Sequence, residues 1–212
     1  MTSARTIVHL VRHGEVYNPE KILYGRLPGY HLSERGVAMA HAVADYLAGN
    51  DVTAIITSSL TRARETAAPL AASHGVTPQT DDRVIEADND FEGQQPTLRT
   101  FLRPGNLRRF TDFTRPSWGE PYAYIAKRMR PAIEDAREAA HGHEAVIVSH
   151  QLPIWIARLD AEGHRLWHDP RSRRCALASV TSFTYAADEL TTISYAEPAA
   201  HLISDDTASV GA

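Results

Sequence analysis

Three short apolar segments, each followed at once by polar residues, form the framework of this chain. They occupy residues 7–11, 54–57 and 145–149. Apolar runs of this length without alternating polar positions are typical of strands buried on both faces of a sheet. Between these segments the apolar residues recur at intervals of three and four, which indicates amphipathic helices.

Four helices are predicted from this spacing. The first follows Ser33, a good N-cap residue, and presents the apolar residues Ala38, Ala42, Val43, Tyr46 and Leu47. The second begins at Ser58 or Ser59 and is ended by Gly75. A third covers residues 120–140, and its apolar face consists of Ile125, Met129, Ile133 and Ala136. A fourth follows the strand at 145–149 and runs to about residue 159.

The remaining segments complete an α/β fold with a mostly parallel central sheet and helices on both faces. Residues 77–80 predict a short third strand, and the alternating runs at 179–185 and 190–195 predict a C-terminal β-hairpin. Glycines and prolines make residues 13–32 a loop, and the tail from residue 198 onward is expected to be loose. Residues 87–120 have little periodicity and predict a cap inserted into a single domain of residues 1–212.

Arginine and histidine residues follow the buried strands directly. Arg12 and His13 come after the first strand, Arg62 lies a few residues after the second, and His150 follows the strand at 145–149. Ligands of open α/β sheets bind beyond the carboxyl ends of the strands, so we expect these side chains to meet there. Two arginines and two histidines at one sheet edge point to phosphoryl chemistry, because guanidinium forks match phosphate oxygens and neutral imidazole is a nucleophile.

Each of these residues also has a purely structural interpretation. Arg62 could be a solvated helix residue that pairs with Glu65, and His150 could be a core histidine bonded to a carbonyl oxygen. The shared position beyond buried strands favours the functional interpretation over these alternatives.

Five motifs in order resemble those of the histidine phosphatase superfamily, also called the phosphoglycerate mutase-like family. The first is the segment Leu10-Val11-Arg12-His13-Gly14-Glu15-Val16-Tyr17-Asn18. Further similarity lies at Gly25 with residues 32–36, at residues 58–67, at residues 84–86 with 91–93, and at residues 148–150. No single motif is specific for this family, but the occurrence of all five in the same order is specific for it.

The resemblance implies a role for each matched residue. His13 would be the nucleophile that forms a phosphohistidine, and Arg12 and Arg62 would hold the phosphoryl oxygens. Further contacts to the phosphate are implied for His150, Asn18 and Gln151. No metal or other cofactor is expected, because the arginines and the histidine supply the positive charge.

A carboxyl group would protonate the leaving oxygen and then activate water. Glu86 matches this position in the family, and Asp88 is its competitor. The segment around Glu86 and the glutamine that follows His150 both depart from the pattern of the sugar-phosphate mutases.

Composition narrows the class of protein. The chain has 212 residues, a net charge of −4 and a single cysteine, so we expect neither a nucleic-acid-binding surface nor an intrachain disulfide. No apolar run is long enough to span a membrane, and we expect a cytoplasmic protein. The partner is expected to be a small phosphorylated substrate, and the late hairpin offers an edge for a possible homodimer.

Two basic segments lie outside these motifs. Residues 99–115 carry five arginines, Arg99, Arg103, Arg108, Arg109 and Arg115, against Asp112 alone. They could recognise a further anionic group of the substrate, although a solvated helix face is the favoured interpretation. Arg171, Arg173 and Arg174 are interpreted as a basic surface loop.

The sequence therefore predicts a metal-independent phosphomonoesterase of the histidine acid phosphatase type, which acts on a small phosphorylated metabolite. A phosphoglycerate-mutase-like phosphoryl transferase and a catalytically weak module that binds a phosphorylated ligand are the alternatives.

Overall fold

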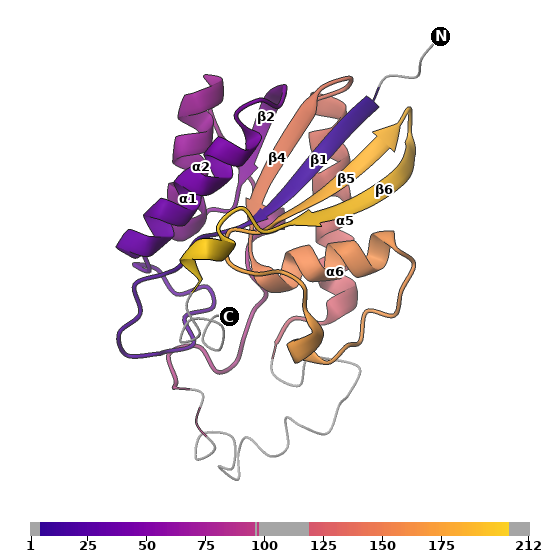
Figure 1. The fold of residues 1–212 in the computed structure, drawn as a ribbon. Helices are drawn as coiled ribbons and strands as arrows, with labels where there is room; N and C mark the ends of the chain where they lie inside the picture. Colours follow the sequence, from indigo (N-terminus) through magenta and orange to yellow (C-terminus); the bar gives the residue numbers. More distant parts are fainter. Residues whose placement is uncertain (1–4, 96, 98–118, 204–212) are drawn as a thin grey trace.

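A six-stranded sheet lies at the centre of the protein (Figure 1). The computed structural model describes residues 5–95, 97 and 119–203. The strand order is β3-β2-β4-β1-β5-β6, and the first four strands in this order are parallel while β5 and β6 are antiparallel to their neighbours. The strands are β1 (Arg5–Arg12), β2 (Val52–Thr57), β3 (Gln79–Thr80), β4 (Glu144–Ser149), β5 (Val180–Ala186) and β6 (Glu189–Ala196).

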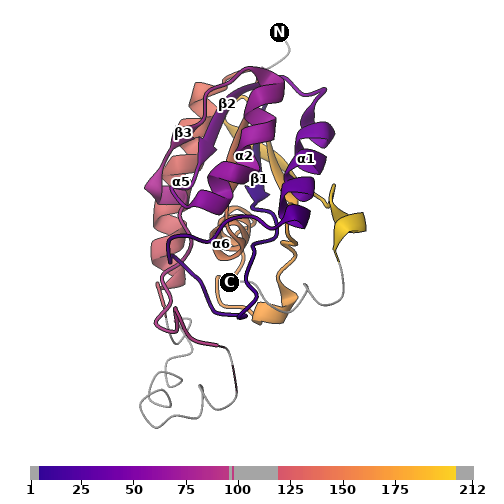
Figure 2. The same ribbon diagram turned by 90° about the vertical axis from the view of Figure 1, so that its left-hand side faces the viewer.

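Helices cover both faces of the sheet, as the sequence predicted. On one face α1 (Glu34–Leu47) and α2 (Thr61–His74) lie side by side (Figures 1 and 2). On the other face α5 (Tyr122–Ala139) packs with α6 (Gln151–Ala161). The described part of the chain also contains the short 3-10 helices η1 (Asp82–Val84), η3 (Pro170–Ser172) and η4 (Ala200–Leu202).

The central strand β4 explains why the strand segments lack polar alternation. Ala145 and Ile147 belong to the core cluster under α5 and α6, whereas Val146 and Val148 belong to the cluster under α1 and α2. Successive side chains of a strand point to opposite faces, so a strand covered on both sides buries successive positions and does not alternate apolar with exposed polar residues.

Helix α1 begins where the sequence predicted, but its buried face differs in part. The hydroxyl oxygen of Ser33 accepts a hydrogen bond from the Gly36 amide at 3.0 Å, which confirms the N-cap. Of the apolar residues assigned to its face, Ala38 and Tyr46 are exposed. Val43 and Leu47 are buried as predicted, and Gly36, Met39, Ala40 and Ala44 complete the buried stripe, which faces the sheet and α2.

The beginning of α2 and the end of the chain also differ from the predictions. Helix α2 starts at Thr61, with Leu60 rather than Ser58 or Ser59 as its N-cap residue, and it ends at Gly75 in the left-handed conformation as predicted. The tail is not loose immediately after residue 198. Ala199 is buried in the core cluster of α1 and α2, and η4 contacts α1.

Most of the predicted cap lies outside the described residues. This applies to residues 98–118 and therefore to all five arginines of the predicted basic segment. The cap and the single domain remain predictions. At the two ends of this segment, Asn89 and Gly119 form an isolated antiparallel bridge. In the part of the chain that the structure describes, no helix is long and apolar enough to cross a membrane.

A close backbone contact at the start of α1 holds this helix against the loop after β1. A Cβ atom added at Gly36 would lie 1.9 Å from the carbonyl oxygen of Glu15. No flexible side chain can relieve that overlap, because the obstructing atom belongs to the backbone.

We predict that Gly36→Ala lowers the free energy of unfolding by about 2 kcal/mol, as overpacking of a dense site typically does. Gly49→Ala is the matched control, since a Cβ at Gly49 meets no atom within 4 Å. Chemical denaturation of both variants measures the difference. Equal stability of the two variants would show that α1 tolerates displacement from the loop.

Candidate active site

The parallel pairing of β1 with β4 brings two histidines together at the carboxyl edge of the sheet. Arg12 and Ser149, the last residues of the two strands, are paired in register. His13 and His150 follow them directly and therefore lie side by side. Their ring centroids are 5.1 Å apart. Arg62, from the first turn of α2, reaches the same point. The structure thus brings together the residues that the strand-end argument selected.

The His13 ring is held in one tautomer. Its Nδ1 lies 2.7 Å from the carbonyl oxygen of Gly14, and a carbonyl only accepts, so Nδ1 carries the hydrogen. Nε2 therefore bears the lone pair and accepts a hydrogen bond from Nε of Arg62 at 3.3 Å. Burial, together with the charges of Arg62 and Arg12, holds the pKa of His13 well below its usual value. The ring is consequently neutral at physiological pH.

Thr66 links α2 to the strand that carries His13. Its hydroxyl oxygen accepts a hydrogen bond from the Gly14 amide at 3.0 Å and donates to the Arg62 carbonyl at 2.7 Å. The turn that fixes the His13 tautomer and the helix that supplies Arg62 are therefore coupled through one hydroxyl group.

The two guanidinium groups are buried and bonded to loop carbonyls. Arg12 donates to the Cys175 carbonyl at 2.7 Å, and Arg62 donates to the Gly25 carbonyl at 2.6 Å. Arg62 is only 1% exposed, so its interpretation as a solvated residue paired with Glu65 is wrong. Glu65 instead bonds the His31 ring and the Leu32 amide.

His150 is not a core histidine bonded to a carbonyl. Its Nε2 lies 2.8 Å from the Ser58 hydroxyl. Nδ1 is buried and has no hydrogen-bond partner in the described part of the chain. Burial first, and then the charge of Arg62, lowers the pKa of His150 well below its usual value. A buried ring nitrogen without a partner, next to His13, is a contact point for a ligand oxygen.

Glu86 places a buried carboxyl group near the arginines. One oxygen accepts a hydrogen bond from the Ala87 amide at 2.8 Å, and the other is buried without a partner among the described residues. Burial raises the pKa of Glu86, opposed by the charges of Arg62 and Arg12. Asp88, its competitor in the sequence, is exposed. The geometry therefore favours Glu86 as the carboxyl group of this site.

The other two predicted phosphate contacts are engaged with the protein itself. Asn18 bonds both the amide and the carbonyl of Ile22 and thereby closes the loop after β1. Gln151 accepts a hydrogen bond from Arg173 and donates to the Cys175 carbonyl, each at 3.4 Å. Their contact with a phosphate remains a prediction.

Sequence reasoning missed three residues of this site. Tyr24 is buried, with its ring 4.8 Å from the Arg62 guanidinium carbon. Ser58, which we expected to begin a helix, bonds His150. Arg173, assigned to a surface loop, is half-buried and lines a cavity of about 60 Å³ together with Glu86. Arg171 and Arg174 are exposed, as predicted. The family motifs were the available signal for two of these residues, because Ser58 begins the matched segment 58–67 and Tyr24 precedes the matched Gly25.

The predicted catalytic side chains are enclosed. His13 and His150 have no exposed surface, and Glu86, Arg12 and Arg62 are each at most 4% exposed. A cavity of about 300 Å³ adjoins them and is lined by Arg12, Gln151, Arg173 and Cys175, among others.

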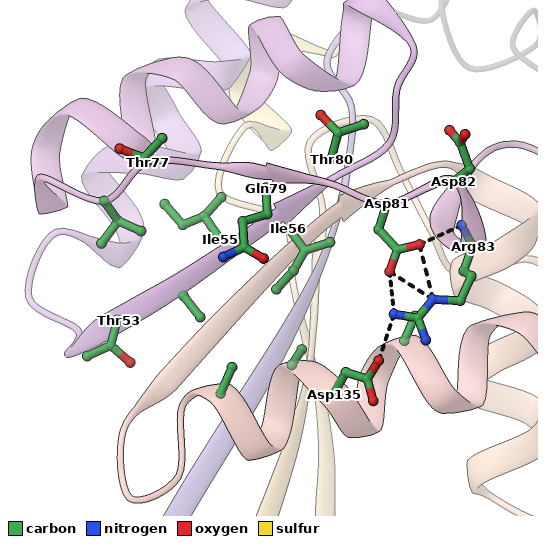
Figure 3. A pocket seen from close by; sticks show the side chains of 15 residues that line it. Thr53, Ile55, Ile56, Thr77, Gln79, Thr80, Asp81, Asp82, Arg83 and Asp135 are labelled. Carbon is green, nitrogen blue, oxygen red and sulfur yellow. Dashed lines mark hydrogen bonds and ion pairs between the residues drawn. The ribbon is translucent and has the colours of Figure 1, made fainter.

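A third cavity, of about 600 Å³, lies away from this site, between β2, β3 and α5 (Figure 3). Its one arginine is already paired, because Arg83 binds Asp81 at 2.6 Å and Asp135 at 2.7 Å. No histidine lines it, and its carboxylates outnumber its single arginine. This cavity is therefore unsuited to bind a phosphate, despite its size.

No group of three or more histidine, cysteine, aspartate or glutamate side chains in the described ranges is arranged to hold a metal ion. The positive charge at the site comes from guanidinium groups, which remain protonated at all physiological pH values.

Comparison with known proteins agrees with this geometry. The sequence model of the histidine phosphatase superfamily (branch 1) matches residues 8–198. The uncharacterized protein Rv0525 of Mycobacterium tuberculosis (strain ATCC 25618 / H37Rv) is 54% identical over 197 residues, which cover 92% of this chain and 98% of that protein. A probable phosphoglycerate mutase, GpmB of Yersinia pestis (strain Pestoides F), is 29% identical over 183 residues, which cover 82% and 83% of the two chains.

A solved structure shows the same fold. The phosphoserine phosphatase of Entamoeba histolytica, a mutant in complex with phosphoserine, superposes with a TM-score of 0.74 at 21% identity and covers 93% of this chain and 100% of its own. The chain belongs to the histidine phosphatase superfamily. Its relatives include phosphatases and phosphoglycerate mutases, and it is an enzyme of phosphoryl chemistry.

The buried neutral histidines make stability depend on pH. In the unfolded chain His150 takes up a proton near its ordinary pKa of 6.5, whereas the folded protein resists this protonation. Stability is therefore lost as the pH falls below about 6.5, by at most about 1.4 kcal/mol per pH unit for each such group. We predict that His150→Gln lowers the slope of unfolding free energy against pH by the contribution of one protonated group.

Glu86→Gln is the control, because folding changes the stability of this group with pH in the opposite direction. Folding raises the pKa of Glu86 above its ordinary value of 4.5, so its contribution to stability is lost as the pH rises above 4.5. Denaturant unfolding between pH 4.5 and 7 should show slopes that change in opposite directions in the two variants. Parallel curves for both variants and the wild type would contradict the burial of these groups in uncharged form.

Proposed function

We propose that this protein is a metal-independent phosphomonoesterase that acts on a small phosphorylated metabolite through a phosphohistidine at His13. The observation that carries the proposal is the lone pair on Nε2, which lies against Arg62 while the Gly14 carbonyl holds the hydrogen on Nδ1. A neutral ring nitrogen in a cationic environment is the form that attacks a phosphorus atom.

In the first half of the reaction, Nε2 of His13 forms a bond to phosphorus as the bond between phosphorus and the ester oxygen breaks. Arg12 and Arg62 neutralise the charge on the non-bridging oxygens, and His150 contributes a further hydrogen bond. Glu86 gives its proton to the leaving oxygen. The raised pKa of Glu86 supports this role, because a protonated carboxyl is required at that moment.

In the second half, the Glu86 carboxylate takes a proton from water as the water oxygen attacks phosphorus. The bond between phosphorus and Nε2 breaks, which returns a neutral imidazole and releases inorganic phosphate. Splitting the transfer into two displacements replaces one difficult step with two easier ones.

A mutase is the second candidate, favoured by the 29% identity to a probable phosphoglycerate mutase. A mutase would return the phosphoryl group to substrate, would require a bisphosphate primer and would yield an isomer. Hydrolysis of p-nitrophenyl phosphate that is insensitive to EDTA and inhibited by vanadate supports the phosphatase. Tight binding of phosphate without turnover would instead indicate a binding module.

Substitution of the nucleophile tests the proposal directly. We predict that His13→Ala reduces kcat on p-nitrophenyl phosphate to less than a few per cent of the wild type and leaves the circular dichroism spectrum unchanged. His164→Ala, at an exposed position, is the control and should retain full activity. More than a few per cent of residual activity in His13→Ala would remove this residue as the nucleophile.

Glu86 is tested by varying the leaving group. An alkoxide needs a proton as it departs, whereas p-nitrophenolate leaves readily without one, so Glu86→Gln should lower kcat/KM for an alkyl phosphate by about 10²- to 10⁴-fold. The loss of kcat/KM on p-nitrophenyl phosphate should be much smaller, because kcat/KM reports the transfer to His13 and not the later attack of water. Asp88→Asn is the matched control, and a larger effect of that substitution would transfer the acid role to Asp88.

A further inference from the structure

Arg173 presents a guanidinium group whose hydrogen-bonding neighbours are all neutral. Its Nε donates to Nε2 of His168 at 2.9 Å, and its Nη1 donates to the Gln151 side-chain oxygen at 3.4 Å. The other ring nitrogen of His168 bonds the Leu166 carbonyl at 2.7 Å, so that ring is neutral. The Tyr122 hydroxyl is a further neighbour. In the described part of the chain, no carboxylate forms an ion pair with Arg173.

Arg62 shares this property within the phosphoryl site, whereas several other described arginines pair with a carboxylate. Arg128 and Arg158, which are also largely buried, pair with Glu120 and Glu162. Arg171, two positions away from Arg173, is exposed and forms a bidentate pair with Asp169. A cation that is partly withdrawn from water without a counter-ion is unfavourable, and a bound anion would relieve that penalty.

The position of Arg173 indicates which part of a substrate it faces. It lines the cavity of about 300 Å³ with Arg12, which belongs to the phosphoryl site. It also lines the cavity of about 60 Å³ with Glu86, the proposed proton donor to the leaving oxygen. Arg173 therefore lies on the side of the site where the alcohol portion of the substrate would emerge.

Charge balance supports a second anion there. Arg12 and Arg62 already match the two negative charges of a phosphate monoester, so Arg173 supplies one additional positive charge beside them. We propose that Arg173 is a specificity-determining residue that binds a second anionic group, a carboxylate or a further phosphate, on the alcohol portion of the substrate. This inference rests on the proposed function, because it takes the ester site at His13 as its starting point.

Binding to the inactive His13→Ala variant tests this role without any turnover. The probes are 2-phosphoglycolate, ethylene glycol bisphosphate and 2-hydroxyethyl phosphate, which differ in having a carboxylate, a second phosphate or a hydroxyl group at the same position. Calorimetry should show that at least one doubly anionic probe binds about 10-fold tighter than the hydroxyl probe. Whichever of the two doubly anionic probes binds more tightly shows whether Arg173 prefers a carboxylate or a phosphate.

Adding Arg173→Met to His13→Ala should abolish the preference, and adding Arg173→Lys should restore part of it. Adding Arg171→Ala is the matched control and should leave the preference unchanged. Equal affinity for all three probes in the Arg173 wild-type background would overturn the proposal. So would an equal loss for all three on Arg173→Met, because Arg173 would then hold the transferred phosphoryl group or serve packing alone.

Turnover distinguishes this inference from the proposed function. With the His13 enzyme, Arg173→Met should lower kcat/KM for the preferred doubly anionic ester about 10-fold more than for the hydroxyl ester. Absence of hydrolysis of any ester would refute the phosphatase, while the binding preference would still decide the role of Arg173.

Discussion

The hydrogen bond between Nδ1 of His13 and the carbonyl oxygen of Gly14 is the constraint on which the chemistry of this site depends. A carboxylate at this position would stabilise an imidazolium, whereas a carbonyl orients the ring without adding a negative charge. Burial and two arginines then keep the ring neutral. The same positive charges that would hold a phosphoryl group thus also keep the proposed nucleophile unprotonated.

The fold imposes this geometry through a few long-range contacts. The register of β1 against β4 fixes the distance between His13 and His150, because both follow paired strand ends. The packing of Gly36 against Glu15 holds α1 against the loop after β1. Thr66 ties Gly14 to α2 and so to Arg62. A site assembled in this way needs a rigid sheet core, which the apolar strands provide.

The sequence was most informative where burial is complete. Strands covered on both faces leave uninterrupted apolar runs, and their ends locate Arg12, His13 and His150. The sequence was least informative for those side chains of the site that lie on loops. Tyr24 and Arg173 occupy segments without periodicity, and only the tertiary approach of those segments to Arg62 and Glu86 distinguishes them from surface residues. The buried stripe of α1 was predicted only in part. Val43 and Leu47 are buried as expected, whereas Gly36 makes a close backbone contact and carries no hydrophobic signal.

The location of the phosphorus atom in a trapped intermediate tests the central claim most directly. The enzyme is mixed with a phosphate monoester, quenched in denaturant within milliseconds, and examined by ³¹P and ¹⁵N nuclear magnetic resonance. The account predicts phosphorus bonded to Nε2 of His13. Phosphorus on Nδ1, phosphorus on another residue, or turnover without any covalent intermediate would contradict it.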